Sequence, residues 1–433
     1  MKSIKNHVLF FVCILVTLGK GIAQVNTVVS SKMNAARLEA ITQVLESFVK
    51  DKHINGAVAV VHRNNQLVYN KAIGYADLEH HKPMTTDAIF RIASQTKAIT
   101  STSIMILMEE GKLLLDDPIE KYLPSFAHPK VLKSFSFKDT TFTTAPSNRS
   151  ITIRDLLTHT SGIGYAQIGS DTARALYAKY GIVGGVGVTD PSVKLQDQMN
   201  KLGTLPLMHQ PGARFTYGLN IDVLGRLVEV LSGMDLATFF QKKIFEPLGM
   251  KDTYFFQPEK NWSRVVPLYS NPMKGVLTKL DTHTDMLGGL YTAYPTYNGT
   301  YYSGGAGLSC IAIDYAKFLQ MLLNNGVYNG KRILSKTSIR MMTTNQIGEL
   351  DFVMAGQQPN NKLGLGFILY TKQGSAQSPL SEGSYAGGGA FYSIYWVDPK
   401  EKITGQLMVN MMPIENTDIW EKFKVAVYQA IVD

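Results

Sequence analysis

Residues 90–97 carry the segment Phe90-Arg91-Ile92-Ala93-Ser94-Gln95-Thr96-Lys97, which places a serine and a lysine three residues apart at the start of an expected helix. Residues 98–110 have helical composition, and Gly111 follows them as a C-terminal stop. Side chains at i and i+3 share one helix face, so the Lys97 amine can reach the Ser94 hydroxyl. A serine becomes a nucleophile when a neighbouring base takes its proton, and a desolvated lysine can do so. Free N–H groups at a helix start can also stabilise developing negative charge.

The elements expected around this segment indicate an α+β fold. Upstream, residues 31–51 have the periodicity of an amphipathic helix, and two strands joined by a short turn follow it. Strand composition returns only late in the chain. The expected strands are 56–62, 66–74, 364–371, 391–397 and 403–412, and the expected late helices are 313–323 and 417–432. We therefore expect an antiparallel sheet built from the N- and C-terminal segments and flanked by helices, with an inserted, mainly helical lobe.

The two lobes divide the chain at approximate boundaries. The sheet lobe is expected at about 31–115 and 300–433, and the helical lobe at about 116–299. The helical lobe contains a polar insert rich in Ser, Thr and Pro at 135–150, which is followed by a capping-box pattern in Thr152-Ile153-Arg154-Asp155. The sequence shows no internal repeat and no long linker. Residues 24–433 are thus expected to form one domain.

Residues 1–23 have the pattern of a secretory signal peptide. Two early lysines precede an apolar run at 7–18, and Gly21-Ile22-Ala23 provides a small-x-small cleavage site. The run is too short to span a bilayer comfortably, although an uncleaved anchor is the alternative. We expect bacterial export to the periplasm or the medium, with no stable membrane insertion after cleavage. Cleavage would leave Cys310 as the one cysteine, so no intramolecular disulfide would be possible.

Charge and histidine placement exclude several classes of function. The net charge of +9 is spread over single residues of a 433-residue chain, without a basic block interleaved with aromatics, so we expect no nucleic-acid partner. His80-His81, His159 and the segment 281–285 are dispersed and lack a second ligand at helical spacing. We therefore expect no metal and no cofactor. The sequence gives no indication of the oligomeric state.

Tyr217 is the second candidate for a catalytic residue. Further candidates are needed because S-x-x-K spacing alone arises by chance on many exposed helices. Tyr217 lies on an expected turn after Gln210-Pro211-Gly212, just before a run that continues into a helix. A phenol normally ionises only near pH values of about 10, and a lysine cation beside it favours the phenolate. Tyr217 can therefore share in taking a proton, although simple packing is the alternative explanation.

The third candidate is the run Gly387-Gly388-Gly389, which precedes Ala390 and Phe391 at the entry to an expected strand. Consecutive glycines weaken a strand and usually mark a close approach by backbone or ligand. An edge strand here could offer an amide N–H to a substrate carbonyl oxygen. A flexible turn is the alternative explanation.

Together these motifs resemble those of the serine β-lactamase and penicillin-binding-protein-like hydrolases, especially the class C β-lactamase and related carboxylesterase branch. Ser94 and Lys97 match S-x-x-K, Tyr217-Gly218-Leu219 falls on the tyrosine motif, and Gly387-Gly388-Gly389 falls on the third motif. The resemblance also covers the segments 156–162, 245–250 and 304–309, and it runs from about Ala35 to the C-terminus. It implies the β-lactamase/transpeptidase-like fold.

The resemblance implies an acyl-enzyme mechanism. Ser94 would attack a carbonyl while Lys97 and Tyr217 share the removal of its proton. The matching positions imply that the N–H groups of Ser94 and Ala390 form an oxyanion hole. The leaving group would take a proton through Tyr217, and water would then release the acid. Loss of one oxyanion donor in such enzymes costs about 3 kcal/mol of transition-state stabilisation.

Two departures from the lactamase pattern affect the substrate-binding positions, which the resemblance assigns to Leu219, Asn220 and Gly387-Gly388-Gly389. Leu219 stands where the lactamase motif has an asparagine, and Asn220 is shifted by one residue at a helix start. Gly387 stands where a lysine or histidine would face a substrate carboxylate. Both departures fit a neutral ester or amide better than a β-lactam.

Three functions remain as hypotheses at this point. The first is an exported serine hydrolase that cleaves an ester or amide of a small or peptide-like substrate. The second is a true class C-type β-lactamase or D-alanyl-D-alanine carboxypeptidase. The third is a non-catalytic protein that binds cell-wall peptide, against which the intact Ser94, Lys97 and Tyr217 argue. The sequence contains no G-x-S-x-G elbow, which argues against an α/β-hydrolase.

Overall fold

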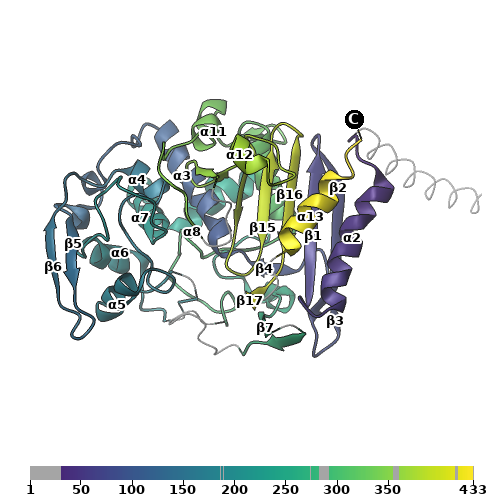
Figure 1. Ribbon diagram of the computed structural model, residues 1–433, viewed down its shortest axis with the longest axis horizontal. Helices are drawn as coiled ribbons and strands as arrows, with labels where there is room; N and C mark the ends of the chain where they lie inside the picture. Colours follow the sequence, from purple (N-terminus) through teal and green to yellow (C-terminus); the bar gives the residue numbers. More distant parts are fainter. Residues whose placement is uncertain are drawn as a thin grey trace, which may run out of the picture.

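The computed structural model describes residues 31–185, 187–188, 190–273, 275–281, 292–354, 360–414 and 418–432 (Figure 1). The expected signal peptide lies outside the described residues, as do His283 and Asp285. Within the described residues, no helix is both long and apolar enough to cross a membrane.

An eight-stranded antiparallel sheet joins the two ends of the chain. Its strand order is β12-β13-β14-β15-β16-β1-β2-β3. The strands are β1 (Gly56–Arg63), β2 (Gln66–Asp77), β3 (Lys82–Pro83), β12 (Lys362–Leu363), β13 (Ile368–Leu369), β14 (Tyr385–Gly388), β15 (Ile394–Asp398) and β16 (Ile403–Met408). The N-terminal strand β1 pairs directly with the C-terminal strand β16, with Ala59 opposite Leu407. The expected α+β fold, with one sheet built from both ends, is confirmed.

Strand β1 is buried on both faces because each face of the sheet is covered. Val58 and Val60 belong to the core that extends into the helical lobe. Ala57, Ala59 and Val61 belong to the core beneath helices α2 (Ala35–Lys50) and α13 (Ile419–Tyr428). Those two helices pack side by side on one face (Figure 1), and α10 (Ala312–Leu323) lies against the other.

The helical lobe packs against α3 (Thr96–Glu109), the helix that follows Ser94, and α7 (Asn220–Ser232) makes the main contact with it. The other helices of this lobe are α4 (Ile153–Leu157), α5 (Asp171–Lys179), α6 (Leu195–Gly203), α8 (Leu236–Phe240), the π-helical turn η4 (Gln241–Phe245) and α9 (Glu246–Leu248). The expected capping box is present, since Thr152 Oγ1 accepts from the Asp155 amide and Asp155 Oδ2 accepts from the Thr152 amide.

The polar insert at 135–150 contributes to a hairpin of β5 (Lys130–Phe135) and β6 (Phe142–Pro146). The extents of two expected strands were wrong. Of the strand expected at 364–371, only Ile368 and Leu369 form a strand, β13, which pairs with β12 on one side and with β14 on the other, and a bend precedes it. The strand expected at 403–412 ends at Met408, and β17 (Met411–Ile414) leaves the sheet to pair with β7 (Tyr269–Met273).

The remaining elements are short. They are β4 (Ile89–Arg91), β8 (Val276–Lys279), β9 (Ser309–Ile311), β10 (Val327–Tyr328), β11 (Lys331–Arg332), α11 (Lys336–Met342), α12 (Lys372–Ser375), and the 3-10 turns η1 (Ala93–Gln95), η2 (Ile119–Lys121), η3 (Pro124–Phe126) and η5 (Glu259–Arg264).

Asp155 generates a prediction about stability. Its carboxylate is 6% exposed and accepts hydrogen bonds from Thr152, Thr160 and Arg149. Asp155→Ala leaves these donors without their acceptor, so we expect a loss of about 2 kcal/mol of stability. Thermal unfolding measures the change. The control is Asp171→Ala, whose ion pair with Arg174 is largely exposed and should contribute less than about 1 kcal/mol. Equal midpoints for the two variants would contradict the prediction.

Candidate active site

Ser94 lies on a tight turn between a short strand and a helix. Strand β4 pairs with β9, the 3-10 turn η1 contains Ser94, and α3 begins two residues later at Thr96. The helix therefore starts slightly after the position that the sequence predicts, and it ends near Gly111 as expected. Ala93, directly before Ser94, has a φ of 41°, which is a strained conformation for a non-glycine residue. The turn is held in place by its surroundings rather than by local preference.

Arg91 supplies part of that support. It is 4% exposed, and its guanidinium donates to the carbonyls of Tyr294, Val266 and Thr292. Burial lowers the pKa of Arg91 to about 10, so the group stays charged near neutral pH. A buried guanidinium that donates to several carbonyls ties the end of β4 to two distant loops. These hydrogen bonds hold in place the backbone that leads into Ser94.

The structure brings Ser94, Lys97 and Tyr217 together, and we call these three side chains the Ser94 cluster. Ser94 Oγ lies 2.7 Å from the Tyr217 hydroxyl, and Lys97 Nζ donates to Ser94 Oγ at 3.2 Å. Lys97 is 7% exposed and also donates to the Gly305 carbonyl at 2.7 Å. Its Nζ lies 4.7 Å from the centroid of the Tyr217 ring. The hydroxyl thus has two possible proton acceptors within hydrogen-bond distance.

His159 positions Tyr217 from behind. Its carbonyl accepts from the Thr216 amide at 2.7 Å, and its Nδ1 accepts from the Gly218 amide at 3.3 Å. The rings of His159 and Tyr217 lie 4.9 Å apart, and Tyr165 stacks on Tyr217 at 5.5 Å. Burial, and then the charge of Lys97, hold the pKa of His159 well below its usual range. His159 is therefore neutral near pH 7, and its hydrogen bonds hold the loop that carries Tyr217.

Leu219 and Asn220 require a correction. Both are 0% exposed, so neither side chain faces a substrate in this structure. Asn220 Nδ2 donates to His159 Nδ1 at 3.0 Å, and Asn220 Oδ1 accepts from Ser161 Oγ at 2.5 Å. At the start of α7 both side chains point into the interior and pack behind Tyr217. These residues support the tyrosine and do not form the substrate surface.

The glycine strand lies directly against the turn that carries Ser94. A Cβ on Gly389 would overlap the carbonyl oxygen of Ile92, two residues before Ser94, so only glycine allows this approach. Gly387, Gly388 and Gly389 are half-buried, and Ala390 is exposed in the turn that follows β14. Within the described residues, the Ala390 amide makes no backbone hydrogen bond. The oxyanion role of the Ser94 and Ala390 amides stays a prediction.

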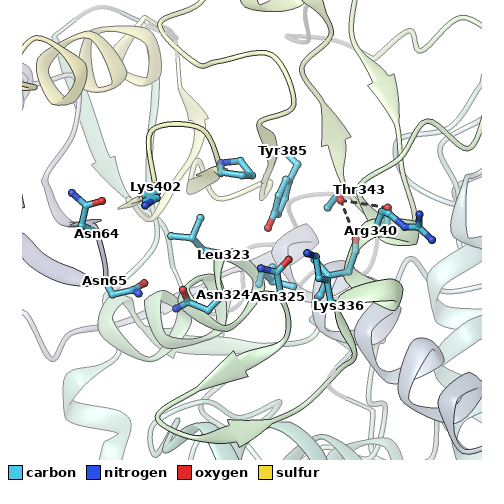
Figure 2. A pocket seen from close by; sticks show the side chains of 13 residues that line it. Asn64, Asn65, Leu323, Asn324, Asn325, Lys336, Arg340, Thr343, Tyr385 and Lys402 are labelled. Atoms are coloured by element: carbon cyan, nitrogen blue, oxygen red, sulfur yellow. Dashed lines mark hydrogen bonds between the residues drawn. The ribbon is translucent and has the colours of Figure 1, made fainter. Parts of the chain in front are cut away.

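A hollow of about 540 Å³ is lined by residues outside the Ser94 cluster (Figure 2). Such a volume could hold a small molecule. Its lining includes Asn64, Lys402 and Tyr385, at the end of β14 opposite Gly388. It contains neither a member of the Ser94 cluster nor a residue of the glycine run. The chemistry of the side chains therefore points to the Ser94 cluster rather than to this hollow.

The sequence reasoning missed three residues next to Lys97. Asp222 lies on the first turn of α7, and Ser303 Oγ donates to it at 2.6 Å. Gly305 accepts from Lys97 through its carbonyl. The five-residue spacing from Tyr217 to Asp222 gave no sign that the Asp222 carboxylate lies near Lys97, because the two groups come near one another only where α7 packs on α3. Among the described residues, no group of three or more potential ligands is placed to hold a metal ion.

Comparison with known proteins identifies the family. The model of the family described as Beta-lactamase matches residues 41–426. The chain belongs to the β-lactamase family. Relatives of this family member include an uncharacterized protein of Mycobacterium tuberculosis, 31% identical over 84% of this chain and 88% of the relative. Esterase EstB of Burkholderia gladioli is 29% identical over 87% of this chain and 90% of its own.

The solved structures agree with the family and with the fold. EstCE1, described as a hydrolase with promiscuous acyltransferase activity, superimposes with a TM-score of 0.77 at 25% identity, over 91% of this chain and 99% of its own. The resemblance to serine β-lactamases and penicillin-binding-protein-like hydrolases is thereby confirmed. The protein is a serine hydrolase of the β-lactamase family.

Gly389→Ala tests the approach of β14 to Ser94. The added methyl would push the strand away from Ile92 and the turn, so we expect labelling of the protein by a fluorophosphonate probe to slow by at least about 10-fold. The matched control is Gly388→Ala. The nearest atom to the added methyl would be the Ser393 carbonyl oxygen at 3.1 Å, so the strand needs to shift much less and labelling should change far less. Equal labelling of both variants would show that this approach is unimportant.

Proposed function

We propose that this protein is an exported hydrolase that forms an acyl-enzyme on Ser94 and cleaves an ester or amide of a small or peptide-like substrate. One observation carries the proposal. The Ser94 hydroxyl lies 2.7 Å from the Tyr217 hydroxyl and 3.2 Å from the Lys97 amine. A nucleophile with adjacent groups that can take its proton is the arrangement that acyl transfer requires.

Acylation uses each member of the Ser94 cluster. Ser94 Oγ bonds to the substrate carbonyl carbon as its proton passes to Tyr217 and Lys97. The carbonyl oxygen becomes an oxyanion, for which the amides of Ser94 and Ala390 are the proposed donors. The bond to the leaving alcohol or amine then breaks, and Tyr217 returns a proton to it. The acyl group remains as an ester on Ser94.

Deacylation repeats these steps with water. A water molecule attacks the acyl carbon and gives its proton to the Tyr217 and Lys97 pair. The ester bond to Ser94 breaks, the carboxylic acid leaves, and the proton returns to Ser94 Oγ. The same pair thus acts as base and then as acid in each half of the cycle.

We propose a neutral ester or amide as the substrate. The run Gly387-Gly388-Gly389 has no side chains and so offers no cation to a substrate carboxylate. A β-lactam or a D-alanyl C-terminus would lose that charge partner. The name of the relative from Burkholderia gladioli, esterase EstB, supports the same choice.

Substrate comparison tests the proposal. We expect the purified mature chain to hydrolyse p-nitrophenyl butyrate and to turn over nitrocefin slowly or not at all. Ser94→Ala and Lys97→Ala should abolish ester cleavage, because the nucleophile or its partner is lost. Tyr217→Phe should lower kcat/KM by about 100-fold or more with an unchanged thermal midpoint, because it removes one proton-transfer group.

Three outcomes would change the conclusion. Fast nitrocefin turnover without ester cleavage would favour a β-lactamase or D-alanyl-D-alanine carboxypeptidase. Absence of any covalent labelling of Ser94 by fluorophosphonate or penicillin probes would favour a non-catalytic binding protein. Wild-type rates in Tyr217→Phe would show that another group takes the proton.

Export rests on the pattern of residues 1–23. When the full chain is expressed in a bacterial host, we expect it in the periplasm or medium, with Gln24 as its first residue. Mass spectrometry of the N-terminal peptide measures the cleavage site. An uncleaved chain in the membrane fraction would contradict the proposal.

A further inference from the structure

Asp222 is a buried carboxylate beside the Ser94 cluster. It is 1% exposed and lies on the first turn of α7, the helix that begins just after Tyr217. Its Oδ1 accepts from Ser303 Oγ at 2.6 Å and from the Gly305 amide at 3.4 Å. A carboxylate is costly to bury unless hydrogen bonds or an opposite charge compensate it. The two bonds give part of that compensation.

The Lys97 amine lies across Gly305 from Asp222. The Gly305 carbonyl accepts from Lys97 Nζ at 2.7 Å, while the Gly305 amide donates to Asp222. A Cβ on Gly305 would overlap Asp222 Oδ2 and lie 3.6 Å from Lys97 Nζ. The amine and the carboxylate therefore face one another over a backbone without a side chain. Glycine at this position is what allows them to approach.

Besides Tyr217, which lies against Ser94 and Lys97, three titratable groups around this pair are neutral near pH 7. Burial, reinforced by the charge of Asp222, holds the pKa values of Tyr165 and Tyr301 well above the ordinary range. His159 is neutral for the reason given above, because burial and Lys97 lower its pKa. Burial also raises the pKa of Asp222 from its ordinary value, while the Ser303 hydrogen bond and the charge of Lys97 act in the opposite direction.

We propose that Asp222 is a positioning residue that stabilises the ammonium form of Lys97 when the proton of Ser94 is transferred, directly or through Tyr217. This inference rests on the proposed function. In the step, the Ser94 O–H bond breaks, the Oγ electron pair forms the bond to the acyl carbon, and the proton arrives on Lys97. The cation that forms is buried, and Asp222 balances it. A base oriented and stabilised by a third group is the general logic of a catalytic triad.

Asp222→Asn tests this role while it preserves the shape of the side chain. A lysine without a nearby negative charge gives up its proton more readily. We therefore expect the acid limb of kcat/KM for p-nitrophenyl butyrate to move to lower pH, and the plateau to fall by about 10-fold or more because the base is weaker. A purely structural role would lower the plateau without moving the limb.

The matched control is Asp314→Asn. Asp314 is also 1% exposed, and burial raises its pKa as well, but it pairs with Lys317 on α10, away from the Ser94 cluster. Its substitution should leave the limb in place. Ser303→Ala removes one hydrogen bond and keeps the charge of Asp222, so the limb should again stay in place even if the rate falls. Gly305→Ala should reduce the rate by forcing Asp222 away from Lys97.

The outcomes separate this inference from the proposed function. An active wild-type protein, an inactive Ser94→Ala and an unmoved acid limb in folded Asp222→Asn would overturn the role of Asp222 alone. If Asp222→Asn does not fold, an active Gly305→Ala with wild-type kcat/KM would overturn it. Ester cleavage that survives in Ser94→Ala would overturn the proposed function itself.

Discussion

The buried amine of Lys97 is the constraint on which the rest of the site depends. Once it has taken a proton, a lysine head group has donors and no acceptor, so it is stable inside a protein only where acceptors or an opposite charge surround it. Ser94 and the Gly305 carbonyl supply acceptors, and Asp222 supplies the charge. These groups come from η1, α7 and the loop before β9. The site is therefore complete only where these elements pack together around Lys97.

Strand β14 of the sheet also contacts the turn that carries Ser94. The end of β14 reaches the turn before Ser94 only because Gly389 has no side chain. Ala93 keeps a positive φ within this contact, and Arg91 fixes the preceding strand through three carbonyls. A strained backbone persists where its surroundings over-determine it. Ser94 is thus held between a strand and a helix rather than on a free loop.

Local patterns explain which parts of the site could be predicted. The S-x-x-K spacing places Lys97 near Ser94 by helix geometry alone, and the capping box at Thr152 needs only neighbouring residues. Leu219 and Asn220 show where such reasoning fails. Their closeness to Tyr217 in the chain suggested the same surface, but the first turn of a buried helix directs them inward. Asp222 was missed for the same reason, since its partners are 81 to 83 residues away along the chain.

The sequence by itself determined the family, the sheet built from both ends of the chain and the closeness of Ser94 to Lys97, because periodicity and short motifs record local geometry. Only the tertiary structure decided which side chains surround the reacting hydroxyl. Tyr217 and Ser94 are 123 residues apart, and their 2.7 Å contact depends on how α7 packs against α3. Helix packing is set by the summed burial of many apolar side chains, which no single motif encodes.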